Sequence, residues 1–294
     1  MTPRAMIEGF NRAKTGHQKK SFYNRTLARP YIDAEQLPVT MAHCLAAAAE
    51  GMRIGLTWQT HGRECYMGID QMGGFNAVII KKRLPDGRQA VVHVEAVFDL
   101  DPFARCTDLM ELFGVSICVV EQLPNVNDAR RFANDEDTKR GISHRGRVFL
   151  AGYGDLRDDM MVWGDTISRS DRKTAEEDRS RYSVNLNQYK CMHALFRIRG
   201  DVVNGKLVPF CLFPNPDALE QDVMDNGKKV RVALLRDWVF PHFTKTALIV
   251  ENEGDESKAK SGGMQVARKT RSKVAKVGID PHFAFANMLC DRTA

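Results

Sequence analysis

Two short apolar segments of this sequence each end in a single carboxylate, a position that suits a metal ligand. The segments are 65–70 (CYMGID) and 115–121 (VSICVVE), and they end in Asp70 and Glu121. A charge at the end of a buried strand costs several kcal/mol unless a cation or hydrogen bonds compensate it. Because hard oxygen ligands suit Mg²⁺ or Mn²⁺, the two acids are candidate ligands for divalent ions.

A third acid, Asp280, precedes the apolar segment 281–290, and proline at position 281 suits the first turn of a helix. Each acid also has an ordinary structural alternative: Asp70 in a glycine turn, Glu121 as a helix cap or arginine partner, and Asp280 as an N-cap. Brought together, the three acids could not stay ionised without cations. Two divalent ions held there would support phosphodiester cleavage without a protein nucleophile.

The composition is that of a globular protein of 294 residues, 43% hydrophobic and 27% charged. Its seven cysteines form no C-x-x-C pair, which favours reduced thiols in a cytoplasm over zinc fingers or disulfides. No apolar run is long enough to span a membrane, and the basic N-terminus lacks the apolar core of a secretion signal. The phosphate-loop motif G-x-x-x-x-G-K-[ST] is absent, so ATP hydrolysis by this chain is not expected.

The pattern of residues predicts an ordered series of elements that places the first two acids together. Residues 1–62 are expected to be a mainly helical N-terminal segment or linker, with a helix over 41–50. Strands joined by hairpin turns are predicted at 65–70, 75–82 and 89–98. A helix over 103–113 then lets the strand 115–121 lie parallel to the first strand. Asp70 and Glu121 would then meet at one edge of the sheet.

The second half of the chain gives a weaker pattern. Helices are predicted at 181–198 and 216–224, and extended chain at 207–213. Residues 254–276 carry many charges and few apolar side chains, which predicts a mobile basic loop. A helix should follow Asp280.

Three groups of residues resemble the nuclease half of bacteriophage terminase large subunits. They are 68–70 (GID) ahead of a glycine turn, 119–133 around Glu121, and 280–286 (DPHFAFA). The stretch 22–31 is similar to the segment that follows the ATPase motor of that family. The resemblance covers about residues 20–150 and 278–294. It implies an α/β, RNase H-like fold over 63–294, with an antiparallel three-stranded meander, parallel strands and flanking helices.

The resemblance also implies a function. The metal-binding and catalytic acids of the family fall on Asp70, Glu121 and Asp280, which would hold two Mg²⁺ or Mn²⁺ ions. The activity implied is metal-dependent cleavage of double-stranded DNA during viral genome packaging, in the cytoplasm of the infected bacterial host. The implied partners are the portal, the small terminase subunit and an ATPase motor half.

Further side chains are candidates for contacts with that substrate. His282 lies close to Asp280 and could touch a metal-bound water or a phosphate, although capping or packing is its commoner role. Basic segments commonly bind phosphates, and a solvated surface is about as common a role. The basic residues expected to contact the DNA backbone are Lys258, Lys260, Arg268, Lys269, Arg271, Lys273 and Lys276.

Two alternatives to the terminase interpretation stay open at the level of sequence. The same fold and acids serve recombinases, transposases and junction resolvases. A non-catalytic DNA-binding or assembly module, in which the acids are structural, is the second alternative.

Overall fold

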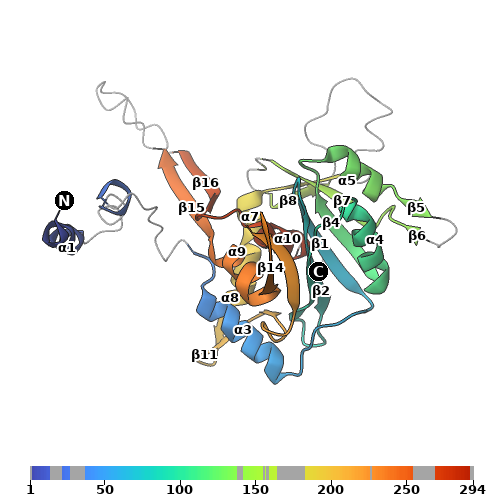
Figure 1. Ribbon diagram of the computed structural model, residues 1–294, viewed down its shortest axis with the longest axis horizontal. Helices are drawn as coiled ribbons and strands as arrows, with labels where there is room; N and C mark the ends of the chain where they lie inside the picture. The colour runs from blue at the N-terminus through green and yellow to red at the C-terminus, as the bar shows by residue number, and fades with distance from the viewer. Residues whose placement is uncertain are drawn as a thin grey trace, which may run out of the picture.

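The computed structural model describes residues 2–13, 22–26, 37–137, 142–154, 156, 159–163, 183–225, 227–253 and 269–291. Its centre is an eight-stranded mixed sheet with the order β12-β3-β2-β1-β4-β7-β9-β8 (Figure 1). The strands are β1 (Cys65–Gln71), β2 (Asn76–Arg83), β3 (Gln89–Val97), β4 (Val115–Glu121), β7 (Val148–Tyr153), β8 (Met161–Trp163), β9 (Ser183–Leu186) and β12 (Cys211–Leu212).

Strand directions follow from the turns and crossovers that connect the strands. β1, β2 and β3 form an antiparallel meander, and the β2–β3 turn contains Gly87 at φ +85°. Helix α4 (Pro102–Leu112) starts where the Asp101 carboxylate accepts hydrogen bonds from the amides of residues 103 and 104. It returns the chain so that β4 lies parallel to β1, and β7 and β9 continue in parallel. This order and these directions are those of an RNase H-like sheet, as the sequence predicted.

Helices cover both faces of the sheet (Figure 1). On one face, α4 and α5 (Val126–Ala133) pack over a core that includes Met67 and Ile69 of β1. On the other face, α10 (His282–Asp291) lies against β1 and β2 in a second core. The alternation of β1 side chains between the two cores follows from the period of two of an extended strand. Helix α3 (Met41–Arg53) packs into the same second core through its buried small side chains.

Helix α10 approaches β1 so closely that no side chain fits between them at Gly68. A Cβ atom on Gly68 would overlap the backbone of Ala286 and Cys290. The Cys290 thiol completes the contact by donating to the carbonyl of Tyr66 at 3.2 Å. The position of the α10 N-terminus at the carboxyl end of β1 depends on this backbone contact.

The far end of α10 is anchored by a buried polar cluster. Lys81 is fully buried, and its Nζ lies 3.6 Å from Asp291 Oδ1 and 3.3 Å from Gln89 Oε1. Arg197 Nε lies 3.5 Å from the other oxygen of the Asp291 carboxylate. A buried ion pair is costly to break from one side, because the remaining charge loses its partner. The cluster therefore fixes the axial position of the helix.

Of two helix predictions in the second half of the chain, the one over 181–198 is confirmed only in its second part and the one over 216–224 is wrong. Residues 181 and 182 lie outside the described residues, and the rest of the helix expected over 181–198 begins with β9, which pairs with β7 inside the sheet. Short helices follow as α7 (Gln188–Met192), η3 (His193–Leu195) and α8 (Phe196–Arg199). Residues 216–224 end in strand β13 (Glu220–Asp225), which forms a hairpin with β14 (Lys228–Ala233). Gly227, at φ +76°, belongs to that hairpin turn and does not end a helix.

The prediction of a basic loop over 254–276 is wrong for its last eight residues. Residues 269–276 form strand β16 (Lys269–Lys276), which pairs with β15 (Thr246–Glu253) in an antiparallel hairpin. Figure 1 shows this hairpin projecting beside the sheet. Tertiary pairing stabilises a strand whose high charge alone favours disorder. Residues 254–268 lie outside the described residues.

The remaining described elements lie outside the sheet. They are α1 (Pro3–Arg12), η1 (Phe22–Thr26), β5 (Glu136–Asp137), β6 (Ile142–Ser143), β10 (Asp201–Val203), β11 (Lys206–Val208), η4 (Leu234–Val239) and α9 (Phe240–Thr244). Among them, η4 and α9 contribute buried side chains to the second core. None of the helices in the described ranges combines the length and apolar character needed to cross a membrane.

The close contact at Gly68 gives a stability prediction. Gly68→Ala should lower the free energy of unfolding by about 1–3 kcal/mol or more, because the backbone of α10 must move to admit the methyl group. Gly73→Ala is the matched control, since a Cβ there meets nothing within 4 Å. Urea unfolding of the two variants measures the difference. Equal stabilities would contradict the close packing of α10 on β1.

Candidate active site

The candidate site lies where the carboxyl ends of three parallel strands meet the start of α10. Asp70 is in β1, Glu121 ends β4 and Tyr153 ends β7. Parallel strands bring their carboxyl ends to one edge of a sheet, where the last side chains face a common space. The register aligns Ile69 with Val120, which places Asp70 and Glu121 at neighbouring positions.

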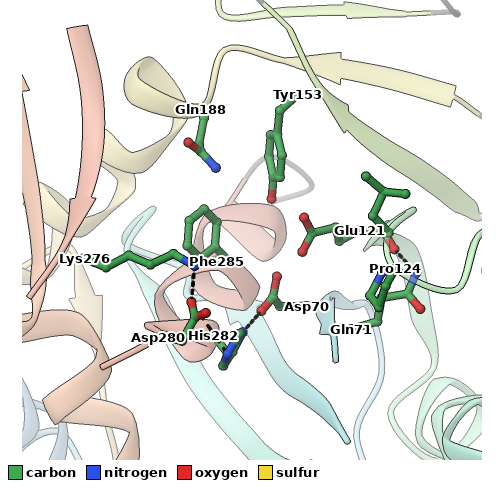
Figure 2. A pocket seen from close by; sticks show the side chains of 11 residues that line it. Asp70, Gln71, Glu121, Pro124, Tyr153, Gln188, Lys276, Asp280, His282 and Phe285 are labelled. Carbon is green, nitrogen blue, oxygen red and sulfur yellow. Dashed lines mark hydrogen bonds and ion pairs between the residues drawn. The ribbon is translucent and has the colours of Figure 1, made fainter. Parts of the chain in front are cut away.

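These side chains surround a cavity of about 280 Å³ (Figure 2). Acidic and basic groups and one aromatic hydroxyl face its interior, and Phe285 of α10 forms part of the wall. Its lining consists of Asp70, Gln71, Glu121, Leu123, Pro124, Tyr153, Gln188, Lys276, Asp280, His282 and Phe285. Residues far apart in the sequence therefore converge at one edge of the sheet.

Asp70 and His282 form a buried pair. His282 Nδ1 lies 2.6 Å from Asp70 Oδ2, and the Asp70 side chain is only 3% exposed. Burial lowers the pKa of His282, so the neutral ring is favoured and can donate its Nδ1 proton to the carboxylate. The ring packs edge-on against Phe75 and so has a fixed orientation. His282 thus orients Asp70 without adding a full positive charge.

Glu121 is held beside β1 by a glutamine bridge. Gln71 Nε2 donates to the Glu121 carbonyl at 2.6 Å, and its Oε1 accepts from the Asn125 amide at 3.3 Å. Burial and the neighbouring Asp70 raise the pKa of Glu121 to about 10. Burial, with a further contribution from Asp280, raises the pKa of Asp70 to about 7. At neutral pH the pair of carboxyls therefore retains a proton that a cation would displace.

Asp280 approaches the same cavity from the segment before α10. Its Oδ1 lies 2.5 Å from Lys276 Nζ at the end of β16, and 3.7 Å from His282 Nε2. The side chain is 46% exposed, in contrast with the two acids on the strands. Lys276 thus compensates Asp280, while no ion pair in the described residues joins Glu121 to a cation.

The chemistry of these groups fits divalent metal ions. Asp70, Glu121 and Asp280 are hard oxygen donors around an open cavity, and burial, with the charge of neighbouring acids, raises the pKa values of Asp70 and Glu121. In the described ranges no three His, Cys, Asp or Glu side chains already stand together as a metal-binding group. The His282 ring lies between Asp280 and Asp70, and the Lys276 ammonium pairs with Asp280. An ion would have to replace Lys276 as the partner of Asp280.

The structure brings together four of the residues singled out from sequence, and one of the basic residues joins them. Asp70, Glu121, Asp280 and His282 all line the cavity, as does Lys276. Lys269, Arg271 and Lys273 lie on β16, where the register aligns Lys269 with Glu253 and Arg271 with Glu251. The other predicted DNA contacts, Lys258, Lys260 and Arg268, lie outside the described residues.

Sequence reasoning did not single out Tyr153 or Gln188 as functional residues. Tyr153 follows an apolar strand in the same way as the two acids, so its position carried a usable signal. The sequence pattern predicts only a short strand over 148–150 there, whereas β7 continues to Tyr153. Gln188 opens the short helix α7 and gave no such signal.

The fold and the acidic cavity together define an RNase H-like domain with a carboxylate-based candidate site. No protein-family model and no curated protein matches the sequence. Among solved structures, the chain is similar to the nuclease domain of the large terminase subunit gp2 of bacterial virus Sf6, at 12% identity, with 86% of this chain and 97% of that chain covered and a TM-score of 0.46. A point variant of that domain with manganese aligns at 12% identity, covering 86% and 98% of the two chains, with a TM-score of 0.47.

The raised pKa values predict a pH-dependent stability in the absence of metal. A folded protein that holds its carboxyl protons more tightly than the unfolded chain loses stability as these groups ionise. The free energy of unfolding should therefore fall between about pH 4.5 and the Glu121 pKa of about 10, by no more than about 1.4 kcal/mol per pH unit for one group. Glu121→Gln should flatten this dependence, and the exposed-site variant Glu220→Gln should not.

Urea denaturation in EDTA at a series of pH values measures the effect. If the parent protein and Glu121→Gln lose stability with pH at the same rate, Glu121 does not carry the raised pKa.

Proposed function

We propose that this chain is a metal-dependent endonuclease that cleaves double-stranded DNA by two-metal phosphodiester hydrolysis. The observation that carries the proposal is the pair of carboxyls, buried Asp70 and half-buried Glu121, with raised pKa values at adjacent strand ends facing an open cavity. Such a pair is costly unless cations neutralise it. Asp280, on the segment that leads into α10, provides the third oxygen donor.

Each residue of the site has its own role in the proposed reaction. Asp70, Glu121 and Asp280 would hold two Mg²⁺ or Mn²⁺ ions, which supply an activated water and neutralise charge on the phosphate when bound. His282 keeps Asp70 oriented by donating to Oδ2. Gln71 keeps the end of β4 beside β1. Lys276, released from Asp280, can pair with a phosphate oxygen of the substrate.

The biological setting of the proposal rests on the sequence resemblance to terminase large subunits. The activity would serve viral genome packaging in the cytoplasm of an infected bacterial host. The portal, the small terminase subunit and an ATPase motor half would be its partners. Strand β16 ends at the cavity with Lys276, and Lys273, which precedes it on the strand, is exposed. The basic residues of β16 would contact the DNA backbone.

Removal of either buried acid should abolish cleavage. Asp70→Asn and Glu121→Gln should each lower the rate of plasmid nicking and linearisation in Mn²⁺ by at least about 100-fold, because each removes an oxygen ligand while conserving shape. Asp201→Asn, at an exposed acid on β10, is the control and should cut like the parent. Agarose gels of timed reactions, with and without EDTA, measure the rates.

A parent protein that leaves DNA intact in both Mg²⁺ and Mn²⁺ would refute the nuclease. Full activity in either acid variant would show that the metal site is elsewhere. Strand transfer, or cleavage confined to branched DNA, would place the chain among recombinases, transposases or resolvases.

The role of Asp280 as a metal ligand has a separate test. Asp280→Asn should weaken Mn²⁺ binding by about 10- to 100-fold, because a carboxylate ligand is lost. Isothermal titration of the metal-free protein with Mn²⁺ measures the affinity. If Asp280 only neutralises Lys276, the Mn²⁺ affinity of the variant will equal that of the parent.

A further inference from the structure

Tyr153 carries a buried hydroxyl that has no hydrogen-bond partner in the described part of the chain. The residue ends β7 and lines the cavity that contains Asp70 and Glu121. In Figure 2 its ring stands across the cavity from Asp70, with the hydroxyl directed into the space between the charged groups. Leaving a buried hydroxyl unpaired costs about 1–3 kcal/mol.

The position of this hydroxyl is set by rigid neighbours. Pairing with β4 and β9 holds β7 on both sides, with Tyr153 aligned to Leu186 of β9. The ring lies 6.1 Å from that of Phe285, on the helix that also carries His282. A side chain fixed between a sheet and a helix loses little further freedom when it contacts a ligand.

The electrostatic surroundings keep the hydroxyl protonated. Burial, together with Glu121 and Asp70, raises the pKa of Tyr153 well above its ordinary value. The group is therefore a hydrogen-bond donor over the whole working pH range. Neither carboxyl accepts a hydrogen bond from it, so the donor is available to an acceptor that enters the cavity.

We propose that the Tyr153 hydroxyl donates a hydrogen bond to a non-bridging oxygen of the phosphodiester that occupies this cavity. The inference rests on the proposed nuclease function and adds to it a substrate contact opposite the acids. The contact holds the phosphate between the sheet edge and α10. Gln188, whose side chain faces the cavity from the same side as Tyr153, limits the space open to the phosphate there (Figure 2).

Tyr153→Phe removes only the hydroxyl and keeps the packing against Phe285. Binding of a short fluorescent DNA duplex in Ca²⁺, measured by anisotropy, should weaken by about 10- to 100-fold, the value of a hydrogen bond to a charged group. Cleavage of the same duplex in Mn²⁺ below saturation should fall by a similar factor. Tyr189→Phe, on α7 but outside the cavity lining, is the matched control and should behave as the parent.

Two further measurements separate this role from a structural or metal-holding one. The melting temperature of Tyr153→Phe should equal or exceed that of the parent, because the variant no longer buries an unpaired hydroxyl, and its rise on addition of Mn²⁺ should equal that of the parent. Loss of the Mn²⁺ response would assign the hydroxyl to the metal ligands and overturn the proposal. Unchanged DNA affinity and cleavage would overturn it as well, since a cavity water would then satisfy the hydroxyl. Activity of the parent and of Tyr189→Phe tests the nuclease function independently of this result.

Discussion

The packing of α10 directly on β1 is the constraint on which the candidate site depends. Gly68 removes the one side chain that would separate the two backbones, so the start of the helix reaches the carboxyl end of the strand. There His282 meets Asp70, and Asp280 faces the cavity. The Lys81–Asp291 pair fixes the opposite end of the helix. A shift of α10 along β1 would break both polar contacts together, so the position of the helix is specified at each end.

The same arrangement produces the electrostatic imbalance at the sheet edge. Parallel strands deliver Asp70 and Glu121 to adjacent places, and burial raises the pKa of both carboxyls. His282 contributes a hydrogen bond but little charge, and Lys276 is engaged by Asp280. The fold thus keeps two acids close, largely shielded from water and incompletely neutralised. Such a state is tolerated at functional sites, where a bound cation compensates the cost.

The first half of the fold could be predicted from sequence because its signals are local. The runs of Val and Ile in β2 and of Val in β3, the Asp86-Gly87 turn and the Asp101 cap each specify an element without help from distant contacts. The second half depends on tertiary structure. β9 has only four residues and is a strand because β7 and β8 flank it. The polar sequence of β13 resembles that of an exposed helix. It forms a strand because it pairs with β14.

The candidate site shows the same division between local and tertiary information. Asp70 and Glu121 could be predicted because each ends an apolar run, and parallel neighbours must bring such ends together. The same rule applies to Tyr153, since β7 is the next parallel strand. The sequence pattern did not indicate Tyr153 because it underestimates the length of β7. Lys276 and Gln188 follow no rule of this kind. Their places depend on how β16 and α7 pack against one another, which no local pattern encodes. The side chains on the parallel strands therefore form the part of the site that the topology itself requires, whereas the groups from β16 and α7 reach the cavity only through the packing of these two elements.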